Sequence, residues 1–130
     1  MEVLCDSSFL MTIVSSRTTC QDKLEYELGP LKFIVPLAVI DELEKIKQRG
    51  GPKRSKIAES AIQIANLNFE IKKIGEIGYH VDELLIEYAT KNNCAVATLD
   101  HDLLKRLIKN DVLVITLSNN RMMIANHYRP

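Results

Sequence analysis

Short, almost continuously apolar runs are the feature that most restricts the fold of this chain. Runs that are apolar throughout, instead of alternating with polar residues, are typical of strands covered on both faces. The clear runs are Glu2 to Cys5, Lys32 to Val35, Cys94 to Leu99 and Val112 to Leu117, and a weaker one is Phe69 to Ile74. We therefore expect a central sheet of four to five strands.

Helical patterns fill the segments between these runs. They cover residues 9–16 continuing through 21–28, then 36–47, 55–67, 79–92 and 102–110. Turn signals follow two of them, at Gly29-Pro30 and at Gly50 to Pro52. Strands that alternate with helices predict an α/β fold, with a parallel sheet, helices on both faces and right-handed crossovers.

Size and composition fit one globular domain. With 130 residues the chain is near the usual domain length, so we expect a single domain over residues 1–130, with 118–130 as a short edge element or extension. No apolar run approaches the ~20 residues of a membrane span. The 17 basic and 17 acidic residues give no net charge, so a polyanion would have to be held by a local basic patch.

The cysteines, the histidines and the chain start exclude several classes. The three cysteines contain no C-x-x-C pair, and the three histidines never recur at i, i+4 spacing, so neither a disulfide framework nor a zinc site is expected. The start, MEVLCD, is acidic where a secretory signal would be basic. We expect a cytoplasmic protein.

Acidic residues follow two of the predicted strands. Asp6 ends the first run, and Asp100 and Asp102 follow the run that ends at Leu99. In an open parallel sheet, ligands bind beyond the carboxyl ends of the strands. An aspartate before a helix is more often a cap, however, and taken singly each of these acids favours that interpretation.

Two further acids lie on predicted helices and point toward the core. Glu42 flanks the apolar stripe of its helix, whereas Asp41 lies nearly opposite that stripe and points toward water. Asp82 lies within the apolar stripe of the predicted helix over residues 79–92, with Glu83 on the far side. Simpler explanations are a cap for Asp82 and a lysine salt bridge for Glu42. A buried carboxylate otherwise needs a hydrogen bond or a metal.

These acids could meet at one edge of the sheet. Converging carboxylates repel by ~1 to 4 kcal/mol per close pair, so a cation is needed to offset the repulsion. Oxygen ligands without cysteine or histidine suit Mg²⁺ or Mn²⁺, which promote phosphate chemistry.

With these motifs the chain resembles the PIN-domain ribonucleases over nearly its whole length. The motifs are VLCDSSFL, VPLAVIDELEKI, VDELLIEYA and VATLDHDLLKRL, in that order. The resemblance implies metal ligands at Asp6, Glu42, Asp82, Asp100 and Asp102, with the hydroxyls of Ser8 and Thr98 in support.

The resemblance also implies a three-layer α/β/α sandwich and a metal-dependent endoribonuclease that leaves 5′-phosphate and 3′-hydroxyl ends. Homodimers are frequent in the family. Two roles follow: a VapC-like toxin restrained by an antitoxin, or an RNA-processing nuclease with a ribosome-assembly partner. The basic segment at residues 45–56 and the SNNR tail slightly favour the RNA-processing role.

A basic segment lies between the first and second pairs of motifs. Residues 45–56 hold six of the basic residues and no acid. A charge run is usually a solvated loop. Beside an acidic metal site it could hold RNA phosphates, and the residues we expect to do so are Arg49, Lys53, Arg54 and Lys56.

Two other functions remain as alternatives. A catalytically silent PIN module that binds RNA or protein would keep the fold without the chemistry. A receiver or haloacid-dehalogenase-like domain also carries acids at strand ends, but Asp6-Ser7-Ser8 lacks the D-x-D pattern of the second, and the third strand has no acceptor aspartate for the first.

Overall fold

The computed structural model describes residues 1–16, 21–75 and 80–127. Its strands are β1 (Glu2–Cys5), β2 (Lys32–Pro36), β3 (Glu70–Lys72), β4 (Ala95–Ala97), β5 (Val114–Ser118) and β6 (Arg121–Ile124). Its helices are α1 (Ser7–Ser15), α2 (Gln21–Leu28), α3 (Leu37–Arg49), α4 (Pro52–Asn68), α5 (Val81–Asn92) and α6 (His101–Lys109), with a short 3₁₀ turn, η1 (Ala125–His127).

The predicted continuation through residues 17–20, the predicted helix start at Tyr79 and the tail end 128–130 lie outside the described residues. No helix in the described ranges is long and apolar enough to cross a membrane.

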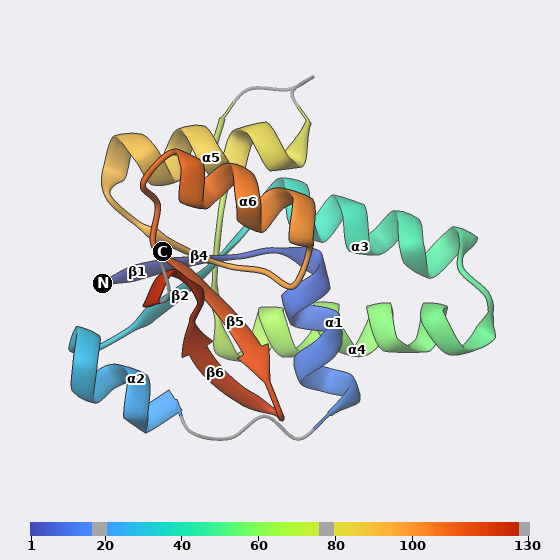
Figure 1. Cartoon of the computed structure of the whole chain (residues 1–130). Helices are drawn as coiled ribbons and strands as arrows, with labels where there is room; N and C mark the ends of the chain where they lie inside the picture. Colours follow the sequence, from blue (N-terminus) through green and yellow to red (C-terminus); the bar gives the residue numbers. More distant parts are fainter. Residues whose placement is uncertain (17–20, 76–79, 128–130) are drawn as a thin grey trace.

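The strands form one mixed sheet in the order β3-β2-β1-β4-β5-β6 (Figure 1). All neighbours pair in parallel except β5 and β6, which are antiparallel. The predicted α/β class is confirmed, with one strand more than the expected four to five. The extra strand comes from the tail, because Asn119 and Asn120 adopt positive φ angles of 52° and 62° and close a two-residue hairpin turn.

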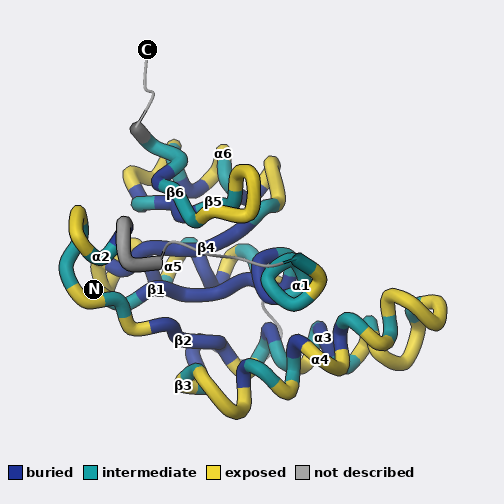
Figure 2. The backbone as a smooth tube through the Cα atoms, turned by 90° about the horizontal axis from the view of Figure 1, so that it is seen from below, coloured by how far each residue is buried: buried dark blue, intermediate teal, exposed yellow. Residues whose placement is uncertain are grey.

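Helices cover both faces of the sheet. Alternate residues along β1 point to opposite sides: Val3 and Cys5 lie in a core with α1 to α4, and Leu4 lies in a second core with α5 and α6. Figure 1 shows these helices on the two sides of the strands, and Figure 2 shows that the central strands are buried. The predicted three-layer α/β/α sandwich is therefore confirmed.

Helices α3 and α4 form a hairpin whose far end extends away from the sheet and is largely exposed (Figure 2). Gly50 ends α3 at this point, where a Cβ atom would lie 2.7 Å from the Ile46 carbonyl oxygen. Only glycine fits so close to the backbone. The basic segment 45–56 occupies this outer part of the hairpin.

Candidate active site

The site lies at the carboxyl edge of the two central strands. Strands β1 and β4 are parallel neighbours, and their last residues, Cys5 and Ala97, are paired. The Asp6 N–H donates to the Ala97 carbonyl oxygen at 3.0 Å. The residues that follow these strands therefore lie side by side. This arrangement was expected, because Asp6 and Asp100 each follow a predicted strand.

Asp6 is held by two hydroxyl groups. Its side chain is 5% exposed, and although it stands at the N-cap position of α1 it makes no capping hydrogen bond. Its Oδ2 atom accepts hydrogen bonds from Ser8 Oγ and Thr98 Oγ1, each at 2.9 Å. Helix capping therefore does not explain this acid.

The two hydroxyls are themselves oriented by the backbone after β4. Ser8 Oγ accepts from the Leu99 N–H, and Thr98 Oγ1 accepts from the Asp100 N–H, both at 3.1 Å. Each hydroxyl has a single proton, and both protons are directed to Asp6. Among the described residues the Oδ1 atom of Asp6 receives no hydrogen bond, so this oxygen is available to a ligand.

Glu42 is held by a neighbouring hydroxyl in the same way. It is half-buried on α3, whose Val39 and Leu43 are buried, while Asp41 is exposed as expected. Ser7 Oγ, in the first turn of α1, donates to Glu42 Oε1. Among the described residues Glu42 forms no ion pair with a lysine, so that simpler explanation fails.

Ser7 is a site residue that the sequence analysis missed. The signal was the hydroxyl pair Ser7-Ser8 directly after Asp6, at the start of a helix. Local sequence could not show that Ser7 donates a hydrogen bond to an acid of α3, whereas Ser8 donates to Asp6.

Asp82 lies near the other acids. It is in the first turn of α5, whose N-cap is His80, so it does not cap the helix. Burial raises the pKa of Asp82, and the negative charges of Asp6, Asp100 and Glu42 raise it further. These four acids, from four different segments, are thus close enough to interact electrostatically.

Arg106 is a second residue that the sequence analysis missed. Its positive charge, on α6, lowers the pKa of Asp82 and so partly opposes the neighbouring acids. No sequence signal links α6 to Asp82, because tertiary packing alone brings the two helices together. The buried residues of α5 are Leu84, Leu85 and Ala89, and Tyr88 is only partly buried.

Asp100 and Asp102 have different surroundings. Asp100 caps α6, because its Oδ1 atom accepts from the N–H groups of Asp102 at 2.9 Å and Leu103 at 3.3 Å. The cap interpretation is correct for this residue, and within the described part of the chain the second carboxylate oxygen receives no hydrogen bond. Asp102 is exposed and is not among the charges that shift the pKa of Asp82.

The donor chemistry of the site fits a hard cation. Its ligand atoms would be carboxylate oxygens, and within the described ranges no lysine or arginine forms an ion pair with Asp6, Glu42 or Asp82. Oxygen donors of this kind suit Mg²⁺ or Mn²⁺. In the same ranges no three acidic, histidine or cysteine side chains are already gathered as a metal site. The acids thus provide suitable ligand atoms, but in the described ranges they are not gathered closely enough to form a metal site.

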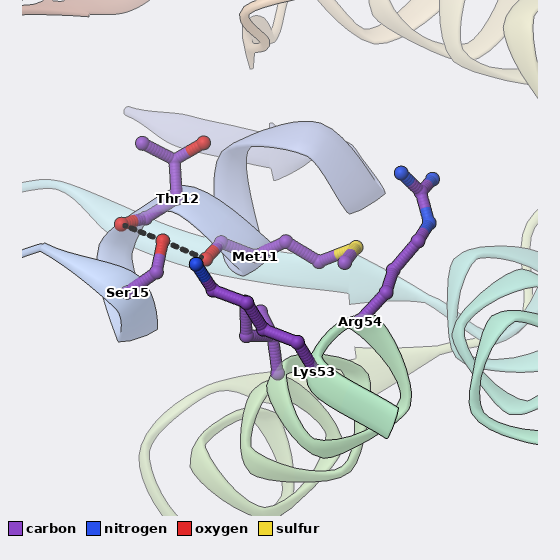
Figure 3. A pocket seen from close by; sticks show the side chains of 6 residues that line it. Met11, Thr12, Ser15, Lys53 and Arg54 are labelled. Atoms are coloured by element: carbon purple, nitrogen blue, oxygen red, sulfur yellow. Dashed lines mark hydrogen bonds between the residues drawn. The ribbon is translucent and has the colours of Figure 1, made fainter. Parts of the chain in front are cut away.

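Two surface hollows contain three of the four expected RNA-binding residues, and the lining of one of them includes Glu42. The first, here called the α3 hollow, has a volume of about 420 Å³ and is lined by Glu42, Lys45, Ile46, Arg49, Gly50 and Arg54. The second, the α1–α4 hollow, measures about 290 Å³ and is lined by Met11, Thr12, Ser15, Lys53, Arg54 and Ile57 (Figure 3). Lys56 is exposed and lines neither hollow.

Comparisons with known proteins agree with this fold. A protein-family model described as "PIN like domain" matches residues 3–120. Among solved structures, the PIN domain endonuclease Utp24 matches with a TM-score of 0.77 at 21% identity, over 96% of this chain and 91% of that one. A domain of a functionally unknown protein from Methanocaldococcus jannaschii matches with a TM-score of 0.62 at 16% identity, over 90% and 91% of the two chains. A comparison with curated protein sequences finds no match.

Proposed function

The chain belongs to the PIN-like domain family, and from the acids at the edge of its sheet we propose that it is a Mg²⁺- or Mn²⁺-dependent endoribonuclease. The observation that carries the proposal is the mutual influence of Asp82, Asp6, Glu42 and Asp100. Arg106 opposes this repulsion only in part, and acids that repel one another are destabilising unless a cation binds between them.

Each residue of the site has a role in this proposal. Asp6, Glu42, Asp82 and Asp100 would hold the metal, and exposed Asp102 would reach its water shell or a second ion. Ser8 and Thr98 fix one oxygen of Asp6, and Ser7 fixes one oxygen of Glu42, so that the remaining oxygens face the ion. Hydrogen-bonded partners of this kind orient metal ligands. When bound, the metal supplies an activated water and neutralises charge on the phosphate.

RNA is the substrate that the basic hairpin favours. Arg49, Lys53, Arg54 and Lys56 are exposed on the segment next to Glu42 and would contact backbone phosphates. Hydrolysis would leave 5′-phosphate and 3′-hydroxyl ends. For the biological role we favour RNA processing with a ribosome-assembly partner over a VapC-like toxin with an antitoxin, and either could act in the cytoplasm as a homodimer.

The test is cleavage of mixed RNAs with Mn²⁺ and with a chelator, followed by mapping of the cut ends. Asp6→Asn and Asp82→Asn should abolish cleavage. Asp41→Asn is the matched control, because Asp41 is an exposed acid next to Glu42 in the chain, on the side of α3 that faces away from the core. Metal-dependent cleavage that persists in Asp6→Asn and Asp82→Asn would refute the proposal.

A silent PIN module that binds RNA or protein is the second candidate. The observation that favours it is that, within residues 1–16, 21–75 and 80–127, no ready-made metal cluster is present. For this candidate, calorimetric titration with Mn²⁺ would give no binding while RNA affinity remained. Metal binding that is lost in Asp6→Asn would exclude it.

A further inference from the structure

We infer that the two hollows form one path for a single-stranded RNA segment, and that an unstacked nucleotide at the end of this path occupies the α1–α4 hollow. This inference rests on the proposed nuclease function and deepens it. It places the substrate strand on a defined course across the surface, which runs from the acids along α3 to Arg54 and then toward α1.

The first part of the path is a row of side chains on one face of α3. Glu42, Lys45 and Arg49 are at positions i, i+3 and i+7, which places them on the same side of the helix. With a rise of about 1.5 Å per residue, the two cations lie about 4.5 and 10.5 Å along the axis from Glu42. A phosphate backbone that leaves the acids along α3 would therefore meet one positive charge after another.

The second part of the path starts from α1. Ser8, which holds Asp6, and Thr12 and Ser15, which line the α1–α4 hollow, are at positions i, i+4 and i+7 of that helix. The Thr12 hydroxyl donates to the Ser8 carbonyl oxygen at 2.8 Å. One face of α1 thus leads directly from the acidic site to this hollow.

Arg54 joins the two parts, since it lines both hollows. Ser55 Oγ donates to the Lys47 carbonyl oxygen at 2.6 Å and so ties the start of α4 to the end of α3. Helix α4 packs against both α1 and α3. The hairpin therefore holds Arg54 in a fixed place relative to the acids.

The cations along the path are uncompensated. Among the described residues, Lys45, Arg49, Lys53 and Arg54 form no ion pair. Lys53 and Arg54 also lie in the first turn of α4, which contains no acid, where positive charge opposes the helix dipole. Charges that weaken their own helix and lack an internal partner favour an external polyanion.

The chemistry of the α1–α4 hollow suits a nucleotide. Met11 and Ile57 give it an apolar wall, and Figure 3 shows Lys53 extending from α4 toward α1. The hydroxyls of Thr12 and Ser15 donate to backbone carbonyls of α1, so they offer lone pairs to the N–H groups of a base. A volume of about 290 Å³ is at the lower limit of small-ligand pockets, so it suits one unstacked unit and excludes a duplex.

The test is the salt dependence of binding, measured by fluorescence anisotropy with a short labelled single-stranded RNA of mixed sequence. Removal of one cation that binds a phosphate should reduce the slope of log K against log salt by about 0.7. We expect this reduction for Arg54→Ala and for Arg49→Ala. Lys47→Ala is the matched control, because Lys47 is an exposed cation of the same hairpin that lines neither hollow, and its slope should equal that of the wild type.

A second pair of variants tests the nucleotide site. Ser15→Leu fills the α1–α4 hollow and should weaken binding of the single strand more than binding of a duplex of the same sequence. Thr90→Leu is the matched control, because Thr90 is an exposed helical residue that lines neither hollow, and it should weaken neither. Circular dichroism checks that each variant is folded.

Three outcomes would contradict the path. Equal slopes for Arg54→Ala and Lys47→Ala would refute the phosphate contacts, and equal weakening of single strand and duplex by Ser15→Leu would refute the nucleotide site. Binding of polyglutamate, but not RNA, through Arg54 would indicate an acidic protein partner instead. Failure of the nuclease proposal itself would be distinguishable, because wild-type RNA cleavage would then be absent.

Discussion

Replacement of Thr98 by valine tests how the site is built. Thr98 is fully buried, and its hydroxyl donates to Asp6 Oδ2 while it accepts from the Asp100 N–H. Valine keeps the branched shape and removes both interactions. A hydrogen bond to a charged group contributes about 1.5–3 kcal/mol, and we expect a loss of that size in the free energy of unfolding. For a chain of this length this corresponds to a fall of roughly 5–12 °C in the melting temperature.

Urea denaturation followed by circular dichroism measures this loss. Thr90→Val is the matched control: Thr90 is exposed on α5, its hydroxyl donates only to the Ile86 carbonyl oxygen, and its replacement should change stability by less than about 0.5 kcal/mol. Ser8→Ala removes the other donor to the same oxygen, so the double variant with Thr98→Val should deviate from additivity. If Thr98→Val is as stable as Thr90→Val, the hydroxyls do not hold Asp6 and the reasoning fails.

The same variant links stability to the proposed metal. Side chains that orient a ligand typically change metal affinity 10- to 100-fold when they are replaced, so we expect Mn²⁺ binding by Thr98→Val to weaken by about that factor. Calorimetric titration of the wild type, Thr98→Val and Thr90→Val would show this. Unchanged affinity in Thr98→Val would mean that Asp6 needs no support from Thr98.

The remaining predictions concern charge, metal and core. The pKa of Asp82 is raised above its ordinary 3.8, mainly by burial, so the metal-free protein loses stability as the pH rises through that raised value. Asp82→Asn should therefore melt at a higher temperature than the wild type at neutral pH without metal, but not below pH 3.8, and an equal or lower melting temperature at neutral pH would contradict this. Saturation with Mn²⁺ at about 100 times its dissociation constant should stabilise the wild type by about 2.7 kcal/mol and leave Asp6→Asn nearly unchanged in thermal shift assays. Leu43→Ala removes a fully buried side chain beneath Glu42 and should lower the free energy of unfolding by about 2–5 kcal/mol in urea titration, where a loss under 1 kcal/mol would show that this core does not support α3.

Much of the architecture could be predicted from local pattern. The apolar runs marked β1, β2, β4 and β5 because both faces of these strands are covered, so most residues along them are apolar. The sequence left the tail open between a short edge element and an extension, because a hairpin strand at the sheet edge has one exposed side. Its burial pattern, with only Ile124 buried, carries little hydrophobic signal. The turn residues Asn119 and Asn120 were the available clue.

The candidate site divides in the same way. Asp6 and Asp100 could be selected as candidates because strand ends are visible in the sequence, and Glu42 and Asp82 because helical period assigns a side chain to a face. Which partner holds each acid was not visible. The bonds from Ser7 to Glu42 and from Thr98 to Asp6 join residues 35 and 92 positions apart.

Sequence alone thus determined the order of strands and helices, the acids and the basic segment, because these depend on periodicity and on residue type at the ends of elements. Tertiary structure decided that Asp100 caps its helix whereas Asp6 does not. It also decided that Arg106 lies near Asp82 and that Arg54 lines both hollows. Hydrogen bonds and electrostatic fields act through space over a few ångströms, and only the fold determines which distant residues come that close.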